Sequence, residues 1–329
     1  MEGVDVIIPL FNCASFIERA IISVQNQLKP VSKIIVINDG STDTGPLIVS
    51  NMARNDKRII LLNGPNQGLS AARNKGIRAS SEAFIAFLDA DDAWEPEKIA
   101  KEFSVISNSP YSFVHTQARA IDTSDQLIDV SLYKSNPNIS PSFDNIRLGI
   151  YPVVGSASSV LTRRKLLFEA GLFDENQHFG GEDWDMWARL AQFGPVCLID
   201  EPLTRIRIVP SSLQRSMSGE DRARSRLHSR IMVASHWQND MEFLLCHRKE
   251  ARKDVWAVLR WLLLKPTALY QFYIFLRHHD EAAGRIIVTN IIDYISLIVR
   301  GMIQTVIGVI GSPGECKRLW NRFKTERNL

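Results

Sequence analysis

The segment AFIAFLDADD, residues 83–92, is a short apolar run that ends in three carboxylates, Asp89, Asp91 and Asp92. An apolar run of this length with charged residues at its end predicts a buried β-strand. Three earlier runs have the same plan, and each leads through polar residues into a helix-like segment. The runs are VDVIIPLF (residues 4–11), KIIVIND (33–39) and RIILLN (58–63), and the helix-like segments cover residues 14–28, 43–54 and 69–80.

This alternation of strands and helices predicts an α/β fold with a mostly parallel, Rossmann-like sheet and helices on both faces. In such sheets, ligands bind beyond the carboxyl ends of the strands. Polar residues of this chain fall there: Asn12, Asp39, residues 66–68 and residues 89–92. We therefore expect the functional site at this edge.

The second half of the chain is less regular. Strands are expected at residues 112–122, 154–163 and 195–208, and a helix is expected at residues 180–194, after a polar loop at 131–142. From residue 216 the pattern becomes helical. We therefore expect a catalytic domain at residues 1–215 and a helical region at residues 216–329.

The composition excludes some classes of protein. The 329 residues carry a formal net charge of only +3, which does not favour nucleic acid as a partner. The four cysteines lie far apart, without the spacing of a zinc site or a disulfide framework. The first residues have no basic segment before their apolar run, so we expect no secretory signal and a cytoplasmic setting.

Apolar and basic residues alternate in the helical region, as in VWAVLRWLLLKP (255–266), and the tail KRLWNRFKTER (317–327) is basic. Such a pattern fits helices at an anionic membrane surface, here the inner face of the cell membrane. It fits equally a helical subdomain packed on the catalytic domain or a homo-oligomer interface. Residues 286–310 are long enough to cross a bilayer but include Asn290, Asp293 and Arg300, which favours a buried or interfacial helix.

Taken alone, the three carboxylates allow two interpretations. Acids at the mouth of a buried strand repel one another unless a cation balances them, which points to Mg²⁺ or Mn²⁺. An aspartate is also a good cap for the helix expected near Pro96. Only the other segments decide between the two.

Four segments in a fixed order, each at a strand end, resemble the family 2 glycosyltransferases. They are VDVIIPLFN (4–12), VINDGSTDT (36–44), NQGLSAARNKG (66–76) and FLDADD (87–92). The resemblance covers roughly residues 4–213. It implies the GT-A fold and an inverting transfer of a sugar, of hexosyl type, from a nucleotide-sugar donor, with UDP first, to a hydroxyl of a saccharide or lipid-linked acceptor.

The resemblance also implies a donor site. Asp39 matches the carboxylate that hydrogen-bonds the nucleobase, and Asp89 and Asp91 match the acids that contact the ribose and the metal, with Asp91 as our first choice of ligand. The remaining donor-binding candidates are Pro9, Asn12, Asn66, Gly68, Arg73 and Ala90. Without the resemblance, Asp39 and Gly40 would be an ordinary turn, and Arg73 a solvated residue of a helix.

The segment GGEDWDMW, residues 180–187, resembles the acceptor-side motif of the family. It implies Asp183 as the general base, with Glu182 and Trp184 on the acceptor side. Acids in the first turn of a helix also offset the helix dipole, and a tryptophan there is often packing.

One position departs from the family pattern, because Val209 stands where relatives often have a histidine. We expect Arg205, Arg207 or Arg215 to take its place.

Other classes of function fit less well. A sugar nucleotidyltransferase would have a glycine-rich basic loop after its first strand, and VIIPLFNCASF has none. A dinucleotide-dependent oxidoreductase would have GxGxxG there. A nucleotide-sugar-binding scaffold that has lost catalysis remains open, although the two carboxylate groups argue against it.

Overall fold

The computed structural model describes residues 2–129, 139–153, 156–176 and 180–209, with 225–227, 230, 236 and 237. The chain divides into two compact units, Met1–Met217 and Ser218–Leu329. The helices expected at residues 255–310 and most of the polar loop at 131–142 lie outside the described residues. Within the described part of the chain, no helix is both long and apolar enough to cross a membrane.

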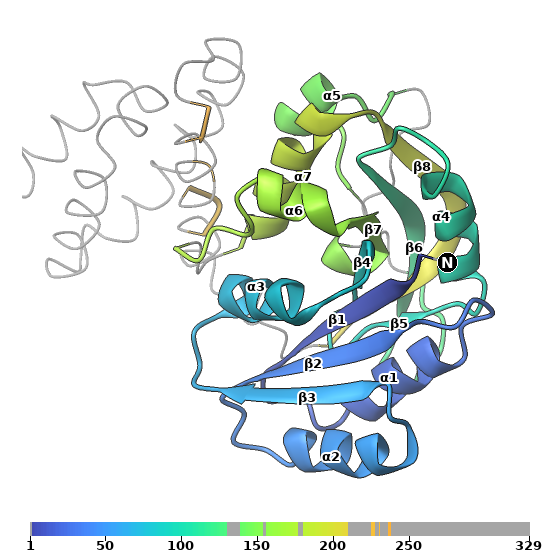
Figure 1. Cartoon of the computed structure of the whole chain (residues 1–329), viewed down its shortest axis with the longest axis vertical. Coiled ribbons are helices and arrows are strands. Elements are labelled where there is room, and N and C mark those ends of the chain that lie inside the picture. The colour runs from blue at the N-terminus through green and yellow to red at the C-terminus, as the bar shows by residue number, and fades with distance from the viewer. Residues whose placement is uncertain are drawn as a thin grey trace, which may run out of the picture. The chain divides into compact units, whose positions relative to one another are not determined.

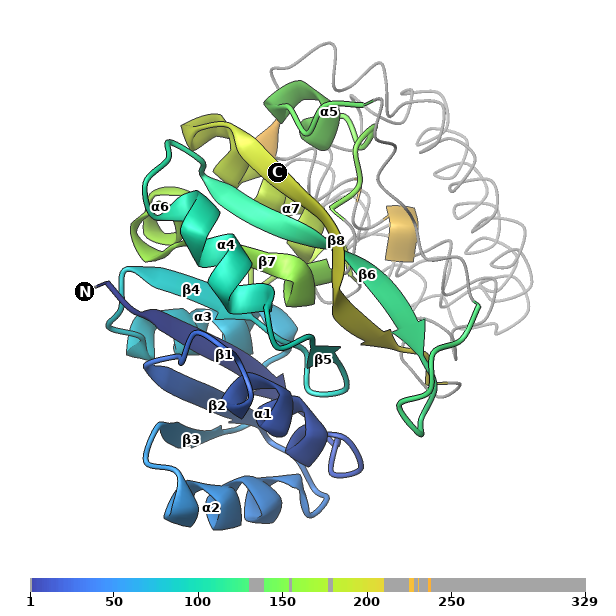
Figure 2. The same cartoon turned by 90° about the vertical axis from the view of Figure 1, so that its right-hand side faces the viewer.

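The first unit is built on one sheet of eight strands, in the order β3-β2-β1-β4-β7-β6-β8-β5 (Figures 1 and 2). The strands are β1 (Val4–Leu10), β2 (Lys33–Asp39), β3 (Ile59–Gly64), β4 (Phe84–Phe87), β5 (Ala93–Trp94), β6 (Phe113–Ile121), β7 (Val160–Arg163) and β8 (Val196–Arg207). The first four strands pair in parallel. Because β7 runs antiparallel to both β4 and β6, and β5 antiparallel to β8, the sheet is mixed.

The helices of this unit are α1 (Ile17–Gln25), α2 (Gly45–Asn55), α3 (Leu69–Ala79), α4 (Lys98–Ile106), α5 (Phe143–Arg147), α6 (Arg164–Glu169) and α7 (Glu182–Leu190), with short 3-10 turns η1 (Ser156–Ser159) and η2 (Ala191–Phe193). Three helices, α1, α2 and α3, connect the parallel strands β1 to β4 as the sequence predicts, and the other helices join the later strands. The strand predicted at residues 154–163 is confirmed at β7, but among the described residues of that segment η1 occupies Ser156–Ser159.

The strands bury both faces because successive side chains point to opposite sides. One face of β1, with Val6 and Ile8, packs with Ile21 of α1, Val49 of α2 and Ile99 of α4. On the other face an aromatic cluster gathers around Trp187 of α7, whose ring lies 5.7 to 6.1 Å from those of Phe87, Phe113 and Phe173. Helices α1, α2 and α4 therefore cover one face of the sheet, and α7 covers the other.

Helix α3 lies close against β1 at Gly76. A Cβ atom added to Gly76 would come within 2.5 Å of Cγ2 of Ile7. The absence of a side chain thus allows this approach. The same helix carries Arg73, one turn earlier, to the carboxyl edge of the sheet.

Candidate functional site

Asp39 ends β2 and holds the loop that leads into α3. Its two carboxylate oxygens accept the backbone N–H groups of Gln67 at 2.8 Å and Gly68 at 2.9 Å. The next residue, Gly40, has a φ of 75°, and a Cβ atom there would lie 2.7 Å from the backbone nitrogen of Asn66. The predicted donor residues Asp39, Asn66 and Gly68 are therefore brought together, although 25 or more residues separate Asp39 from the other two.

Asn12 joins the end of β1 to the same region. Its backbone has a φ of 48°, and its side-chain oxygen accepts the backbone N–H of Thr42 at 2.8 Å. Its own N–H donates to Oγ of Ser41 at 3.1 Å. Pro9 precedes Asn12 in the sequence, is buried in β1 and pairs with Ile37 of β2. Asn12 thus lies at the exposed rim, and Pro9 in the sheet below it.

Arg73 is the most deeply buried charge of the site, with its side chain fully inaccessible to solvent. One guanidinium nitrogen donates to Asp89 at 2.9 Å and the other to Glu182 at 2.8 Å. Its guanidinium also lies over the ring of Phe173, 5.3 Å from the centroid. Arg73 therefore joins the end of β4 to the first residue of α7, which is 109 residues away in the sequence.

These contacts change the role expected for Arg73. Burial alone would lower the pKa of its guanidinium, but the charges of Asp89, Glu182 and Asp183 raise it. The cation is thus committed to carboxylates of the protein. Direct contact of Arg73 with a donor phosphate stays a prediction, and the structure gives this side chain a connecting position.

The acids after β4 lie in an environment that disfavours their charges. Burial and the neighbouring Asp89 raise the pKa of Asp91 to about 6. Burial, followed by the charges of Asp91 and Asp89, raises the pKa of Asp92 well above its usual value. Ala90, between them, is buried. Clustered carboxylates of this kind are short of positive charge.

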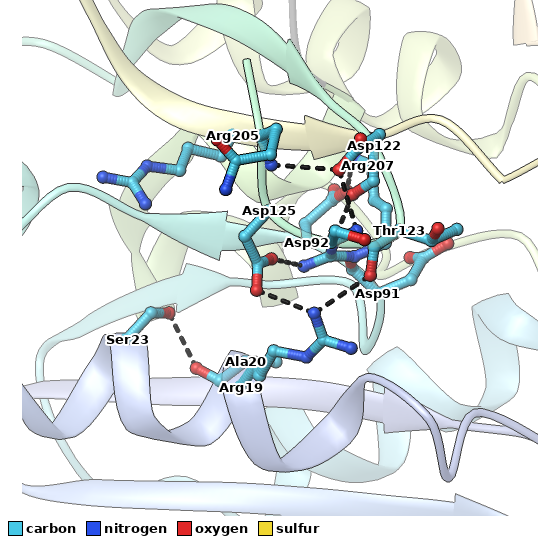
Figure 3. A network of polar contacts seen from close by, with 12 residues as sticks. Arg19, Ala20, Ser23, Asp91, Asp92, Asp122, Thr123, Asp125, Arg205 and Arg207 are labelled. Atoms are coloured by element: carbon cyan, nitrogen blue, oxygen red, sulfur yellow. Dashed lines mark hydrogen bonds and ion pairs between the residues drawn. The ribbon is translucent and has the colours of Figure 1, made fainter. Parts of the chain in front are cut away.

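Arg207, the last residue of β8, also contacts this cluster, although β7 and β6 lie between β8 and β4 in the sheet. Its Nε donates to the carbonyl oxygen of Asp91 at 2.7 Å, and its backbone N–H donates to the carboxylate of Asp92 at 3.0 Å. Figure 3 shows its guanidinium meeting Asp125, which Arg19 of α1 also contacts at 2.7 Å. Arg207 thus ties residues 91–92 to the turn at Asp122–Gln126.

Two of the three arginines expected to take the place of a histidine at position 209 are described by the structure. Arg205 forms a double hydrogen bond with Glu95 at 2.8 and 2.6 Å. Arg215 lies outside the described residues. Of the two that are described, Arg207 is the arginine that contacts the carboxylate segment.

The carboxylates fit a divalent ion in part. Both oxygens of Asp92 already accept hydrogen bonds, one from Ser158 at 2.7 Å and one from the backbone of Arg207. From the described residues, the Asp91 carboxylate accepts no side-chain hydrogen bond, and Asp89 is one-quarter exposed. No group of three or more metal-binding side chains gathers within the described ranges. Mg²⁺ commonly takes one or two protein carboxylates with substrate phosphate oxygens, and Asp91 and Asp89 stay the predicted ligands.

The acidic residues at the start of α7 divide between two roles. Glu182 is buried and paired with Arg73, so it connects to the carboxylate cluster rather than extending outward. Asp183 is partly exposed, and its two oxygens accept the N–H of Trp184 at 2.7 Å and the hydroxyl of Ser156 at 3.0 Å. The indole nitrogen of Trp184 donates to the carbonyl of Ile146 at 2.8 Å, which packs the ring toward α5.

Two serines of η1 belong to the candidate site, and sequence reasoning does not identify them. Ser156 contacts Asp183, and Ser158 contacts both Asp92 and the backbone N–H of Asp89. The segment GSASS has small polar residues in a strand-like context, and nothing in it distinguishes a hydroxyl that binds a carboxylate from one that faces solvent. Only the three-dimensional arrangement identifies them.

Comparison with known proteins agrees with this geometry. Residues 5–168, about half of the chain, match the family model described as glycosyl transferase family 2. An uncharacterized glycosyltransferase of Rickettsia bellii is 32% identical over 62% of this chain and 29% of its own length. The chondroitin synthase of Pasteurella multocida is 26% identical over 58% of this chain and 19% of its own length. The chain thus spans less than a third of the length of either relative.

A solved structure shares the fold. The crystal structure of residues 1–349 of S. aureus TarS in complex with UDP-GlcNAc superposes with a TM-score of 0.60, covering 90% of this chain and 88% of that one, at 17% sequence identity. At this level of identity the likeness establishes the GT-A fold alone. With the family model, the ordered strand-end segments and this architecture in agreement, the chain belongs to glycosyl transferase family 2.

Proposed function

We propose that this chain is an inverting glycosyltransferase that moves a sugar from a nucleotide-sugar donor to a hydroxyl group during glycan biosynthesis. One observation carries the proposal. Arg73 bonds both Asp89, at the end of β4, and Glu182, the neighbour of Asp183. The candidate donor carboxylates and the candidate base are thereby held at one edge of the sheet, where α/β proteins bind ligands.

Asp183 is the proposed general base. The acceptor hydroxyl oxygen attacks the anomeric carbon and forms the new glycosidic bond, while the bond from that carbon to the diphosphate oxygen breaks. The hydroxyl proton passes to Asp183, and the electron pair leaves with the nucleoside diphosphate. Attack opposite the leaving group inverts the anomeric centre, and a carboxylate within hydrogen-bond reach of the hydroxyl lowers the barrier.

The donor would lie across the ends of β1, β2 and β4. Asp39 would contact the base, and the rim at Asn12 and the loop at residues 66–68 would enclose the nucleoside. UDP is the first candidate, because the structurally similar TarS was crystallised with UDP and with UDP-GlcNAc. Asp91 and Asp89 would hold Mg²⁺ or Mn²⁺. Such an ion supplies positive charge that stabilises the departing diphosphate.

The acceptor is proposed to be a saccharide or a lipid-linked saccharide. A relative of this chain is named a chondroitin synthase, which favours a growing glycan as the acceptor class. Association with an anionic membrane through the region after residue 215 remains a proposal. Co-sedimentation of the full-length protein with anionic but not with neutral vesicles is the result that supports it.

The experiment that tests the function measures release of the nucleoside diphosphate from UDP-, GDP- and dTDP-sugars, with and without Mn²⁺. Asp183→Asn keeps the shape of the side chain but cannot accept the proton, so we expect turnover to fall by roughly 100-fold or more with little change in nucleotide affinity. Asp174→Asn is the matched control, because Asp174 is a partly exposed acid before α7 whose carboxylate accepts hydrogen bonds from Asn176. Full turnover by Asp183→Asn would remove Asp183 from the mechanism. Binding of a nucleotide sugar without turnover would instead favour the inactive scaffold.

A further inference from the structure

The turn η1 touches both carboxylate groups of the site within three residues. Ser156 donates its hydroxyl hydrogen bond to Asp183 at 3.0 Å. Ser158 donates to Asp92 at 2.7 Å and accepts the backbone N–H of Asp89 at 3.0 Å. The carboxylates themselves come from segments about ninety residues apart in the chain.

Ser156 has a strained backbone that aims its side chain. Its φ is 53°, in the left-handed region that L-residues other than glycine seldom adopt. Such strain costs on the order of 1 kcal/mol and persists where the surroundings fix it. The carbonyl oxygen of Ser156 accepts the hydroxyl of Ser159 at 3.2 Å, which holds the turn in this shape.

The hydroxyl of Ser156 limits the positions that the Asp183 carboxylate can adopt. One oxygen of Asp183 is bound by the backbone N–H of Trp184 and the other by Ser156. An ionised carboxylate has about four acceptor positions, so the two bonds leave room for a substrate hydroxyl. With both oxygens held, the plane of the carboxylate is fixed before a substrate arrives.

Ser158 acts on the other group in a different way. Its side chain is fully buried, and its carbonyl oxygen accepts the indole N–H of Trp94 at 2.7 Å. One hydroxyl thus closes the turn from Asp89 to Asp92 at both of its ends. The turn therefore holds Asp91, which is partly buried, between two residues that Ser158 contacts.

We propose that Ser156 is a positioning residue for Asp183, and that Ser158 is a positioning residue for the Asp89–Asp92 turn. In this way η1 fixes the positions of the proton acceptor and the donor carboxylates relative to each other. The inference rests on the proposed function and adds two residues to it. Neither serine reacts with the substrate. The two are expected to affect different steps, because they hold different carboxylates.

The test uses the full-length protein and two single variants. Ser156→Gly removes the hydroxyl and also relieves the backbone strain, so the variant is expected to fold at least as stably as the natural protein. Its turnover, measured as UDP release from a UDP-sugar, should fall roughly 10- to 100-fold, as expected for loss of a hydrogen bond to a charged group. Its affinity for UDP should stay within about twofold.

Ser158→Ala should give the opposite pattern. The Asp89–Asp92 turn loses its closing bond, so the affinity for UDP in the presence of Mn²⁺ should fall roughly tenfold, with a smaller change in turnover at saturating donor. Thr162→Val is the control, because Thr162 lies in β7 directly after η1 and loses a buried hydroxyl bond of 2.9 Å to Ser112 that touches neither carboxylate group. It should change neither quantity by more than about twofold.

A double variant distinguishes positioning from a general effect on structure. In an Asp183→Asn background the carboxylate that Ser156 orients is gone, so adding Ser156→Gly should change the residual rate by less than about twofold. An undiminished additional loss would overturn the assignment of Ser156. If the natural protein is active and Ser156→Gly matches it, the inference alone is wrong. If the natural protein neither binds nor turns over any nucleotide sugar, the proposed function is wrong as well.

Discussion

Replacing Arg73 by methionine removes the buried cation that connects β4 to α7. Methionine keeps most of the side-chain length and its packing against Phe173, whose ring centroid lies 5.3 Å from the guanidinium. It leaves Asp89 and Glu182 without their partner. Asp89 is one-quarter exposed and can be solvated, whereas the side chain of Glu182 is only 9% exposed. The penalty should therefore come mainly from Glu182.

The size of the effect follows from the burial of the pair. Removing one partner of a buried ion pair costs about 3–5 kcal/mol, because the remaining charge is left without compensation. A typical domain has about 5–15 kcal/mol of stability in total. Arg73→Met should therefore remove a large share of the free energy of unfolding of the first unit. Burial and Asp183 already raise the pKa of Glu182, so part of the relief should come from protonation of Glu182.

Urea unfolding followed by tryptophan fluorescence measures this, because Trp187 packs against Phe173 beside the pair. Arg78→Met is the matched control on the same helix. Arg78 is 55% exposed and pairs with Glu175 at 3.5 Å, so its loss should cost less than about 1 kcal/mol. Adding Glu182→Gln to Arg73→Met should recover part of the stability. A loss below about 1 kcal/mol for Arg73→Met, or no recovery in the double variant, would refute the reasoning.

Three further predictions concern pH, packing and the donor loop. Burial lowers the pKa of His115 from 6.5 to about 3. Between those pH values the unfolded chain binds a proton that the folded protein does not. The free energy of unfolding should therefore fall with falling pH, by up to about 1.4 kcal/mol per pH unit. His115→Gln should flatten this slope in urea titrations at a series of pH values, and an unchanged slope would contradict the assignment. Gly76→Ala places a Cβ atom 2.5 Å from Ile7 and should lower the free energy of unfolding by about 1–3 kcal/mol, whereas an unchanged urea midpoint would show that α3 can move away freely. Asp39→Asn replaces one of the two oxygens that accept the N–H groups of Gln67 and Gly68 by an NH2 donor, so calorimetry should show roughly tenfold weaker UDP binding. Undiminished binding would exclude Asp39 from the nucleotide site.

The parallel half of the fold could be predicted from the sequence because each strand has a clear pattern and a polar end. Helix α3 and the first four strands agree with the structure to within a residue or two. The shorter elements carry too few residues for a pattern, as in β5, which has two. The sequence pattern predicts a strand at Ser156, where the structure has a 3-10 turn, because a positive φ at a residue other than glycine cannot be recognised from the composition.

The charged residues of the candidate site could be named from the sequence, but the hydrogen bonds between them could not. The strand pattern places Asp39 and Asp89 at the carboxyl edge of the sheet, and the resemblance to the family adds Asp183 at the start of a helix. The bond from Arg73 to Glu182 joins residues 109 positions apart, and that of Arg207 to the Asp91 carbonyl joins residues 116 apart. Local patterns contain no information about such pairs. The resemblance therefore predicts Arg73 as a donor-binding residue, and the structure shows it bonded to protein carboxylates.

The late position of Arg207 has a consequence for synthesis of the protein on the ribosome. The candidate donor residues are all translated by residue 92, but the side chain that ties Asp91 to the Asp122–Gln126 turn comes 116 residues after Asp91. Because chains emerge from the N-terminus and domains fold as units, a nascent chain that ends before Arg207 carries every donor segment without its final restraint. We therefore expect residues 91 and 92 to reach their final arrangement only after β8 has been synthesised.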